Sequence, residues 1–199
     1  MQTIGGKQFF PLDPRPEDID VRDIAHALSH ICRFGGHCHT FYSVGEHSVR
    51  VALAILEAGG SYAEQLEGLL HDAAEAYVGA MVWPLKRSGE VTGYREIEHR
   101  IEEVIAEKFG LPLKRSPIVK RFDLVLLSTE KRDLMNEGPG REDGAHREAA
   151  SARGELGKWQ TDEFAPLRDR IEPWSSARTR DMFLEYFDGL RRHETRRSP

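Results

Sequence analysis

Cysteine is nearly absent from this 199-residue chain, which contains only Cys32 and Cys38. The five residues between them fit neither a CxxC redox motif nor a cysteine-rich zinc module, so we interpret both as reduced, partly buried thiols. The chain also has no apolar run near the roughly 20 residues that a membrane span needs. Its first residues lack the basic and apolar regions of a secretion signal. These absences predict a cytoplasmic protein without disulfides and without a membrane partner.

Charge is abundant but balanced, which argues against a large basic surface. Charged residues make up 31% of the chain, both signs are interspersed, and the formal net charge is −5. Proteins that bind nucleic-acid polymers carry clustered Lys and Arg, and only the short tail 191–197 has such a cluster. Chain ends are commonly frayed and solvated, and we interpret the tail in that way. A nucleic-acid polymer is therefore not expected as a partner.

Apolar residues recur at helical spacing along almost the whole chain, which predicts an all-α bundle of about six helices. Ser43 with Glu46, and Ser61 with Glu64, have the spacing of a capping box at a helix start. A chain of this length buries roughly 70% of its unfolded surface, so one domain over 1–199 is expected. The helices are expected over 22–32, 43–59, 61–79, 92–109, 118–135 and 176–192.

Two stretches fall outside this helical pattern. Gln8–Phe10 and Ile19–Val21, separated by a proline-rich turn, could pair as a short N-terminal β-hairpin. The stretch 136–160 is polar and rich in Gly, Glu and Arg, which favours a mobile surface loop and leaves a lid over the site as the alternative. The core of the domain is thus expected over about 20–137, with 138–199 forming a loop and a C-terminal helix.

His71 and Asp72 are the most informative pair in the sequence. Alone, they would be read as a His–Asp hydrogen bond on a solvated face. His47 and Asp123, on neighbouring helical patterns, add one potential ligand each. Two nitrogens and two oxygens suit Mn, Co, Fe, Ni or Zn better than Ca, Mg or a thiolate-bound zinc. Four ligands also leave positions open for water and substrate, so we predict one catalytic divalent transition metal.

The order His47, His71-Asp72, Asp123 resembles the H…HD…D pattern of the HD-domain metal-dependent phosphohydrolases. The surrounding sequence is similar to one branch of that superfamily, the bacterial 5′-deoxynucleotidases and the phage dATP triphosphohydrolases. The resemblance covers roughly residues 1–137. The stretches that carry it are 41–49 (FYSVGEHSV), 69–77 (LLHDAAEAY) and 84–86 (PLK).

The resemblance and the helical spacing together imply roles for five further residues. Glu75 follows His71 by four positions and can share its helix face, which suits an acid/base or water-orienting carboxylate. Arg33 and Phe34 look like the family's arginine–aromatic pair, in which the guanidinium clamps phosphate and the ring packs on sugar or base. Lys86 is a weaker phosphate candidate, and His37 is a candidate phosphate donor.

Simpler interpretations of these residues stay open. Arg33 could be a cation that offsets the dipole at the end of the first helix. Lys86 could be an ordinary surface lysine, and a structural role fits His37 equally well. Glu130 and Asp133, further along the helix of Asp123, are interpreted mainly as surface charges that could line a substrate cleft.

One position departs from the deoxynucleotidase pattern. Those proteins carry an aspartate nine positions after the histidine of the doublet, and this chain has Ala80 there. If the aspartate supplies a proton or helps to hold a second ion, this chain lacks that group. Either Glu75 carries proton transfer unaided, or hydrolysis is weakened, or the chain binds nucleotides without efficient turnover.

The resemblance therefore implies hydrolysis of a phosphate ester in a nucleotide, with deoxynucleotides favoured. Either a 5′-phosphate would leave a dNMP or triphosphate would leave a dNTP. The alternative is a nucleotide sensor that keeps the metal and has lost proton transfer. Relatives of this kind commonly form homo-oligomers, and the apolar face of the last helix suggests one here.

Overall fold

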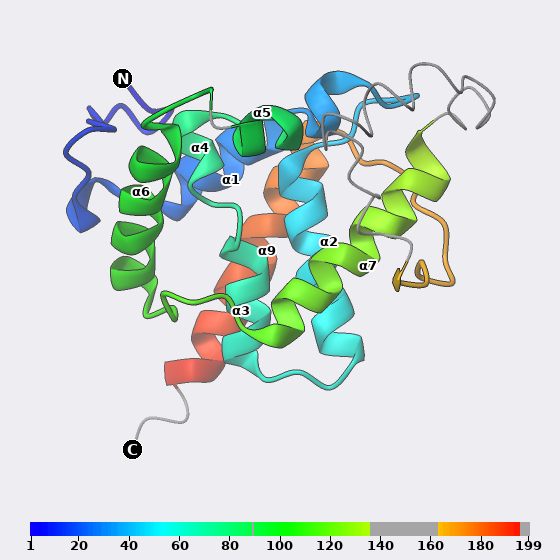
Figure 1. The fold of residues 1–199 in the computed structure, drawn as a ribbon. Coiled ribbons are helices and arrows are strands. Elements are labelled where there is room, and N and C mark those ends of the chain that lie inside the picture. Colours follow the sequence, from blue (N-terminus) through cyan, green and yellow to red (C-terminus); the bar gives the residue numbers. More distant parts are fainter. Residues whose placement is uncertain (89, 136–162, 196–199) are drawn as a thin grey trace.

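The fold is a bundle of helices, as expected from the periodicity (Figure 1). The computed structural model describes residues 1–88, 90–135 and 163–195. Six helices in this part of the chain have nine or more residues, which confirms the all-α prediction. They are α1 (Val21–His30), α2 (Val44–Glu57), α3 (Tyr62–Leu70), α6 (Tyr94–Phe109), α7 (Pro117–Leu134) and α9 (Ser176–Thr195). The shorter elements are α4 (Glu75–Val78), α5 (Trp83–Ser88) and the 3₁₀ turns η1 (Pro16–Asp18) and η2 (Arg33–Gly36).

Serine caps begin several of the helices. Ser61 and Glu64 form the complete capping box predicted for α3. Ser43 accepts a hydrogen bond from the Glu46 backbone at the start of α2, but the Glu46 carboxylate bonds Arg50 instead of completing the box. Ser116 caps α7, where the proline next to it suits the first helical turn. Local side-chain chemistry therefore sets where these helices begin.

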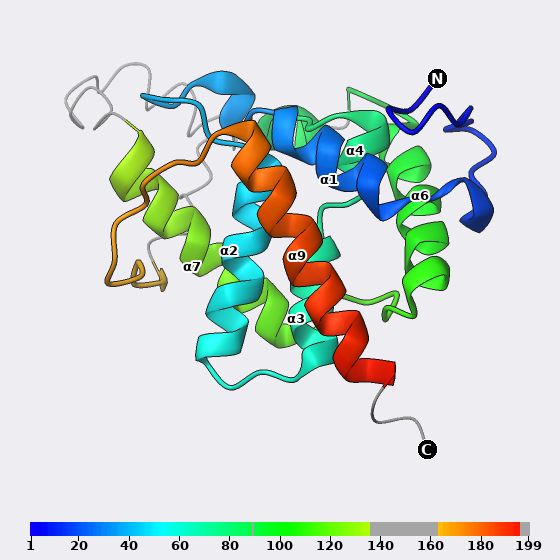
Figure 2. The same cartoon turned by 180° about the vertical axis from the view of Figure 1, so that it is seen from behind.

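Helix α2 lies at the centre of the bundle and packs against α1, α3, α7 and α9. Figure 2 shows α9 running across α2 and α3 on one side of the molecule. Its apolar residues Phe183 and Phe187 are buried in the main core, together with Leu28 of α1 and Leu69 of α3. The opposite side of α2 packs on α7 through a smaller apolar cluster. Two faces of α2 are thus fixed by burial, which holds the helix rigidly between its neighbours.

The apolar face of α9 is used inside the molecule. The suggestion that this face serves an oligomer interface is wrong for Phe183, Phe187 and Leu190, because these side chains are buried in the core. The expectation of a homo-oligomer itself stays a prediction. Among the described residues, no helix combines the length and the apolar character that crossing a membrane requires.

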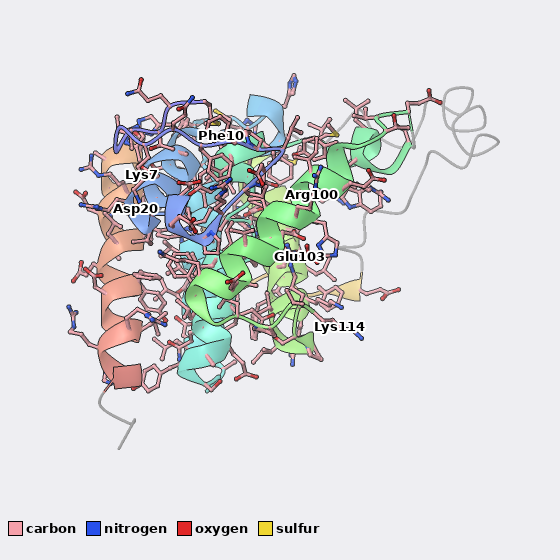
Figure 3. The ribbon with its side chains drawn as sticks, turned by 90° about the vertical axis from the view of Figure 1, so that its left-hand side faces the viewer. Lys7, Phe10, Asp20, Arg100, Glu103 and Lys114 are labelled. Carbon is pink, nitrogen blue, oxygen red and sulfur yellow. The ribbon has the colours of Figure 1, made fainter. Side chains whose placement is uncertain are left out.

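The N-terminal segment does not form the predicted hairpin. Gln2 and Gln8 make an isolated antiparallel bridge, and Val21 already belongs to α1. Phe9 is buried and stacks on Tyr77 with ring centroids 4.1 Å apart. Burial of the Phe9 ring and the hydrogen bond from the Gly5 N–H to Asp23 of α1 hold this segment on the bundle. Figure 3 shows the segment, with Phe10 labelled, beside α6.

The polar stretch 136–160, predicted to be a loop or lid, lies within 136–162 and so outside the described residues. Cys32 and Cys38 are both free and half-buried, as predicted.

Candidate metal centre

The His71-Asp72 doublet lies at a break between two helices. We expected one helix from Ser61 toward Gly79, but α3 ends at Leu70 and α4 begins at Glu75. The intervening backbone bonds, such as Glu75 N–H to Asp72 carbonyl at 3.0 Å, span three residues instead of four. The doublet therefore sits on a tightened turn, which changes the direction of its side chains relative to a continuous helix.

One atom of each predicted ligand points to a common centre. Nε2 of His47 lies 3.3 Å from Nε2 of His71 and 3.2 Å from Oδ1 of Asp123. Oδ2 of Asp72 lies 3.0 Å from Nε2 of His71 and 4.0 Å from Nε2 of His47. Ligand atoms about 2.0–2.2 Å from one tetrahedral or octahedral ion stand roughly 2.8–3.6 Å apart when adjacent and about 4 Å or more when opposite. The observed spacings fit one ion.

The far nitrogen of each histidine ring already has a partner. Nδ1 of His47 lies 2.6 Å from Oε1 of Glu130, and Nδ1 of His71 lies 2.8 Å from the carbonyl oxygen of Gly68. Both partners are acceptors, so each Nδ1 carries the proton and donates it. In the neutral form of each ring, Nε2 then directs its lone pair at the centre, which is the tautomer that a metal ligand needs.

The far oxygens of the two carboxylates are held in the same way by Arg115. Its guanidinium donates to Oδ1 of Asp72 at 3.2 Å and lies 3.5 Å from Oδ2 of Asp123. It also donates to the His71 carbonyl at 2.7 Å. Arg115 therefore fixes the side of each aspartate that faces away from the centre. All four ligands are oriented from behind, as metal ligands usually are.

His47, His71 and Asp72 form a group able to hold a metal ion, and Asp123 completes a set of two nitrogens and two oxygens. His47 is fully buried and His71 nearly so. Two lone pairs directed at each other across 3.3 Å, with two carboxylates beside them, are poorly accommodated without a positive charge between them. The donors present fit a divalent cation.

The pKa values of these ligands are linked. Burial and Arg33 lower the pKa of His47, but Glu130 and Asp123 outweigh them and raise it to about 9. Burial raises the pKa of Asp123, yet its hydrogen bond to His47 and the charge of His71 lower it to about 2. At neutral pH a proton on Nε2 of His47 thus stabilises the centre when no metal does. Proton and cation compete for the same nitrogen.

Glu75 has the opposite shift. Burial and the negative charge of Asp72 raise the pKa of its carboxyl to about 8, against the opposing charges of Arg33 and Lys86. The carboxyl is therefore largely protonated at pH 7 and can donate a proton near the centre. A bound cation would lower the pKa of Glu75 toward neutral pH. Near its pKa the carboxyl can both donate and accept a proton.

Arg33 lies at the centre but is held by a residue that we had not placed there. Its Nε and one terminal nitrogen donate to Oε2 of Glu130 at 3.1 and 3.0 Å, and its other terminal nitrogen lies 3.8 Å from Asp72. Our interpretation of Glu130 as surface charge is wrong, because Glu130 is fully buried. Asp133 is buried as well, with 2% of its side chain exposed beside Arg132.

Phe34 follows Arg33 in a strained turn. Its φ of 54° is in the left-handed region, and it is the one non-glycine residue with positive φ in the described chain. Bulky side chains rarely adopt this conformation, and such strain concentrates at functional sites. The Arg33 guanidinium lies 5.2 Å from the centre of the Phe34 ring, which fits a cation–π contact.

The other two predicted substrate residues are less well placed. Lys86 Nζ bonds both oxygens of Glu98 on α6, at 2.7 and 2.6 Å, so its charge is already neutralised. His37 is exposed after η2, and its backbone N–H bonds the Phe34 carbonyl. Nothing brings its side chain to the centre. The simpler interpretations of both residues therefore fit better.

Sequence reasoning missed Arg115 altogether. It belongs to the loop before α7, and no periodicity or motif marks it. The only local signal is a basic pair, Lys114-Arg115, ahead of the serine cap of α7. A cavity of about 160 Å³ adjoins the centre at Arg115 and His71 and continues along α6 past Glu102 and Glu103. Figure 3 shows Glu103 and Lys114 on that side of the molecule.

Comparison with known proteins gives a clear relative. The chain is 36% identical over 192 residues to the uncharacterized protein YfdR of Escherichia coli (strain K12), covering 96% of this chain and 94% of YfdR. This chain belongs to the YfdR family. It is also 37% identical over 125 residues to an uncharacterized protein of Rhodobacter capsulatus, covering 60% of this chain and 63% of that protein. No model of a protein family matches the chain.

The match to YfdR leaves out only a few residues, so it spans the whole segment from His47 to Asp123 that carries the four ligands. YfdR is therefore aligned with this chain throughout the metal centre. Both relatives are uncharacterized proteins, so the chemistry follows from the side chains of the centre.

Proposed function

We propose that this chain is a metal-dependent phosphohydrolase of the HD type that acts on nucleotides. One observation carries the proposal: two histidines and two aspartates from three separate segments direct one atom each to a common point, with their remaining polar atoms held from behind. The order of these residues matches the H…HD…D pattern that the sequence resembles. The donor set favours Mn, Co, Fe, Ni or Zn.

The charge around the centre supports an anionic substrate. Asp72, Asp123 and Glu130 carry three negative charges, and Arg33 and Arg115 carry two positive charges, while Glu75 is largely protonated. His47 holds a second proton below its pKa of about 9, so the metal-free centre is close to neutral. A divalent cation that displaces this proton makes the net charge about +1. A phosphate monoester or polyphosphate is therefore attracted only after the metal is in place.

The residues of this chain divide the work of hydrolysis. A cation held by the four ligands supplies Lewis acidity, lowering the pKa of water and polarising phosphoryl oxygen. Arg33 faces the centre and can take a phosphate oxygen through a terminal nitrogen while Glu130 fixes its other side. Glu75, protonated near neutral pH, delivers a proton to the leaving oxygen.

The nucleotide part of the proposal comes from the resemblance to deoxynucleotidases and dATP triphosphohydrolases. The strained, half-buried ring of Phe34 supports it, because an aromatic face next to a phosphate-binding arginine suits a sugar or base. Both dNMP and dNTP substrates agree with these features.

The second candidate function is a nucleotide sensor without efficient turnover. Ala80, where the resembled family has an aspartate, favours it. Ala80 is exposed and follows Gly79, whose φ of 79° ends α4. A sensor would bind nucleotide and metal through the same centre, but it would release no phosphate.

The deciding experiment is an assay of the purified protein, stripped of metal and reloaded with Mn²⁺ or Co²⁺. Released phosphate and triphosphate are measured across the dNMPs, dNTPs and their ribonucleotide counterparts. We expect turnover of at least one deoxynucleotide, abolished in Asp72→Asn. Tight nucleotide binding without turnover would favour the sensor. No binding and no turnover would contradict both candidates.

A further inference from the structure

Glu130 contacts two groups of the centre that have different tasks. One carboxylate oxygen accepts the Nδ1 proton of His47 at 2.6 Å. The other accepts two hydrogen bonds from Arg33, at 3.1 and 3.0 Å. The side chain is fully buried, so water does not compete for either oxygen.

We propose that Glu130 is a positioning residue that sets the metal ligand His47 and the phosphate-binding Arg33 relative to each other. This inference rests on the proposed function and deepens it. Nothing in the local sequence of α7 announces the role, because both partners of Glu130 lie more than 80 residues earlier in the chain.

The first half of the role concerns His47. A carboxylate behind a metal-binding imidazole keeps the proton on Nδ1, fixes the ring plane and makes Nε2 a better ligand. The ring of His47 is buried on α2, and α7 packs along that helix (Figure 1). Because the packing of α2 on α7 fixes the distance between their backbones, a single glutamate can hold the ring in one orientation.

The second half concerns Arg33. A long arginine side chain has many rotamers, and ordering it costs free energy when the substrate binds. Two hydrogen bonds to Glu130 hold the guanidinium in place before substrate arrives. The nitrogen that stays 3.8 Å from Asp72, without a hydrogen bond to Glu130, is left at the centre for a phosphate oxygen.

Glutamine is the informative substitution because it has the same shape and no charge. In Glu130→Gln the amide oxygen can accept from His47 or from Arg33, but the amide nitrogen then faces the other partner with a proton. One of the two contacts must fail. If Glu130 only stabilised the fold, the folded fraction of Glu130→Gln would bind metal and phosphate with the affinities of the wild type.

Asp133→Asn is the matched control. Asp133 lies one turn further along α7, is also buried, and accepts hydrogen bonds from Arg132 and the Ile171 backbone. It contacts no residue of the centre. Loss of its charge should lower stability without touching His47 or Arg33.

The test measures two affinities that need no catalysis. Calorimetry gives the dissociation constant of Co²⁺ from the metal-stripped protein, and then that of inorganic phosphate from the Co²⁺-loaded protein. Changing a residue behind a metal ligand typically costs 10–100-fold in metal affinity. We expect Glu130→Gln to lose at least 10-fold in Co²⁺ or in phosphate affinity, while Asp133→Asn stays within twofold of the wild type in both.

If Glu130→Gln leaves Arg33 as an unpaired buried charge and does not fold, Arg33→Leu/Glu130→Gln removes both charges and is compared with Arg33→Leu alone. Co²⁺ affinity then reports on His47 directly, and equal affinities in these two variants overturn the inference. Wild-type affinities in Glu130→Gln also overturn it, as does an equal loss in Asp133→Asn.

A wild type that binds Co²⁺ but hydrolyses no nucleotide contradicts the proposed function alone, and the affinity ratios still decide the role of Glu130. A wild type that binds no Co²⁺ overturns both.

Discussion

Each ligand of the centre directs one polar atom at the ion position, and its other polar atom contacts a neighbouring group of the protein. His47 and His71 do so through Glu130 and a backbone carbonyl, and the two aspartates through Arg115. Such ordering before binding reduces the entropy that the cation must overcome. It also keeps a proton on Nδ1 of each imidazole, so each ring binds a cation through Nε2. At the scale of single residues, the site is already arranged for a metal.

The raised pKa of His47 predicts that metal affinity depends on pH. The folded protein without metal holds a second proton on this ring below a pKa of about 9, and the cation must displace it. The apparent affinity for Mn²⁺ should therefore rise about tenfold per pH unit between pH 6.5 and 8.5 and level off near pH 9. Competition with a chelator of known affinity measures it. A flat profile would show that His47 is not the ligand that loses a proton.

Glu75 should matter for chemistry and not for metal binding. Its protonated carboxyl is our source of a proton for the leaving oxygen, so Glu75→Gln should lower kcat by about 10²–10⁴-fold. The dissociation constant for Mn²⁺ should change by less than threefold. Glu107→Gln, at an exposed position of α6, is the control and should leave both quantities unchanged. Loss of metal binding in Glu75→Gln would instead assign this side chain to the ligand set.

Single residues were predictable where a motif carried them and not otherwise. His47, His71 and Asp72 lie in stretches that resemble a known family, and Asp123 and Arg33 match single positions of that family's pattern. Glu130 and Arg115 could not be predicted, because the partners of each are distant in the sequence. A glutamate in a helix is interpreted as a surface charge when its partners are not known. Lys86 is the opposite case. The family pattern suggested that it binds phosphate, but its ammonium group is paired with Glu98.

At the scale of helices, α1 and α2 approach each other closely at Gly45, in the first turn of α2. This contact positions His47, which lies two residues after Gly45. A Cβ added to Gly45 would lie 3.1 Å from the backbone of Leu28 and of Ser29, and 3.0 Å from the Thr179 side chain. Backbone atoms cannot step aside as a flexible side chain can. The first turn of α2 therefore depends on glycine at this position.

Gly45→Ala should consequently lower the free energy of unfolding by about 1–3 kcal/mol, the usual cost of overpacking. Gly189→Ala in α9 is the matched control, because a Cβ there meets nothing within 4 Å. Alanine favours helix over glycine by about 0.5–1 kcal/mol, so the control should be stabilised. Urea denaturation of both variants measures the difference. Stabilisation by both substitutions would mean that α1 and α2 are less tightly packed than described.

Helices were predictable to within a few residues where a cap and a periodicity coincided, as at Ser61, Ser116 and Gly110. The break after Leu70 was not, because Leu69, Leu70, Ala73 and Ala74 continue a helical pattern through it. The N-terminal hairpin failed for a related reason. Two short runs on either side of a proline-rich turn suggested paired strands, but Phe9 packs on Tyr77 of α4 and Val21 begins α1.

At the scale of the whole molecule, the centre joins α2, the α3–α4 turn and α7, which are far apart in sequence. A cation bound there crosslinks the bundle and stabilises the folded state by mass action. At a free Mn²⁺ concentration 100 times its dissociation constant the gain is about 2.7 kcal/mol. For a chain of 199 residues the melting temperature should rise by about 5–10 °C. Asp123→Asn should lose most of this shift, and an equal shift in that variant would place the ion elsewhere.

The metal centre can be located by anomalous diffraction from crystals of the protein grown with Mn²⁺. We predict one strong peak within about 2.0–2.3 Å of Nε2 of His47 and His71 and of a carboxylate oxygen of Asp72 and Asp123. No peak at this position, in crystals whose His and Asp side chains are well ordered, would contradict the metal centre and the phosphohydrolase proposed from it.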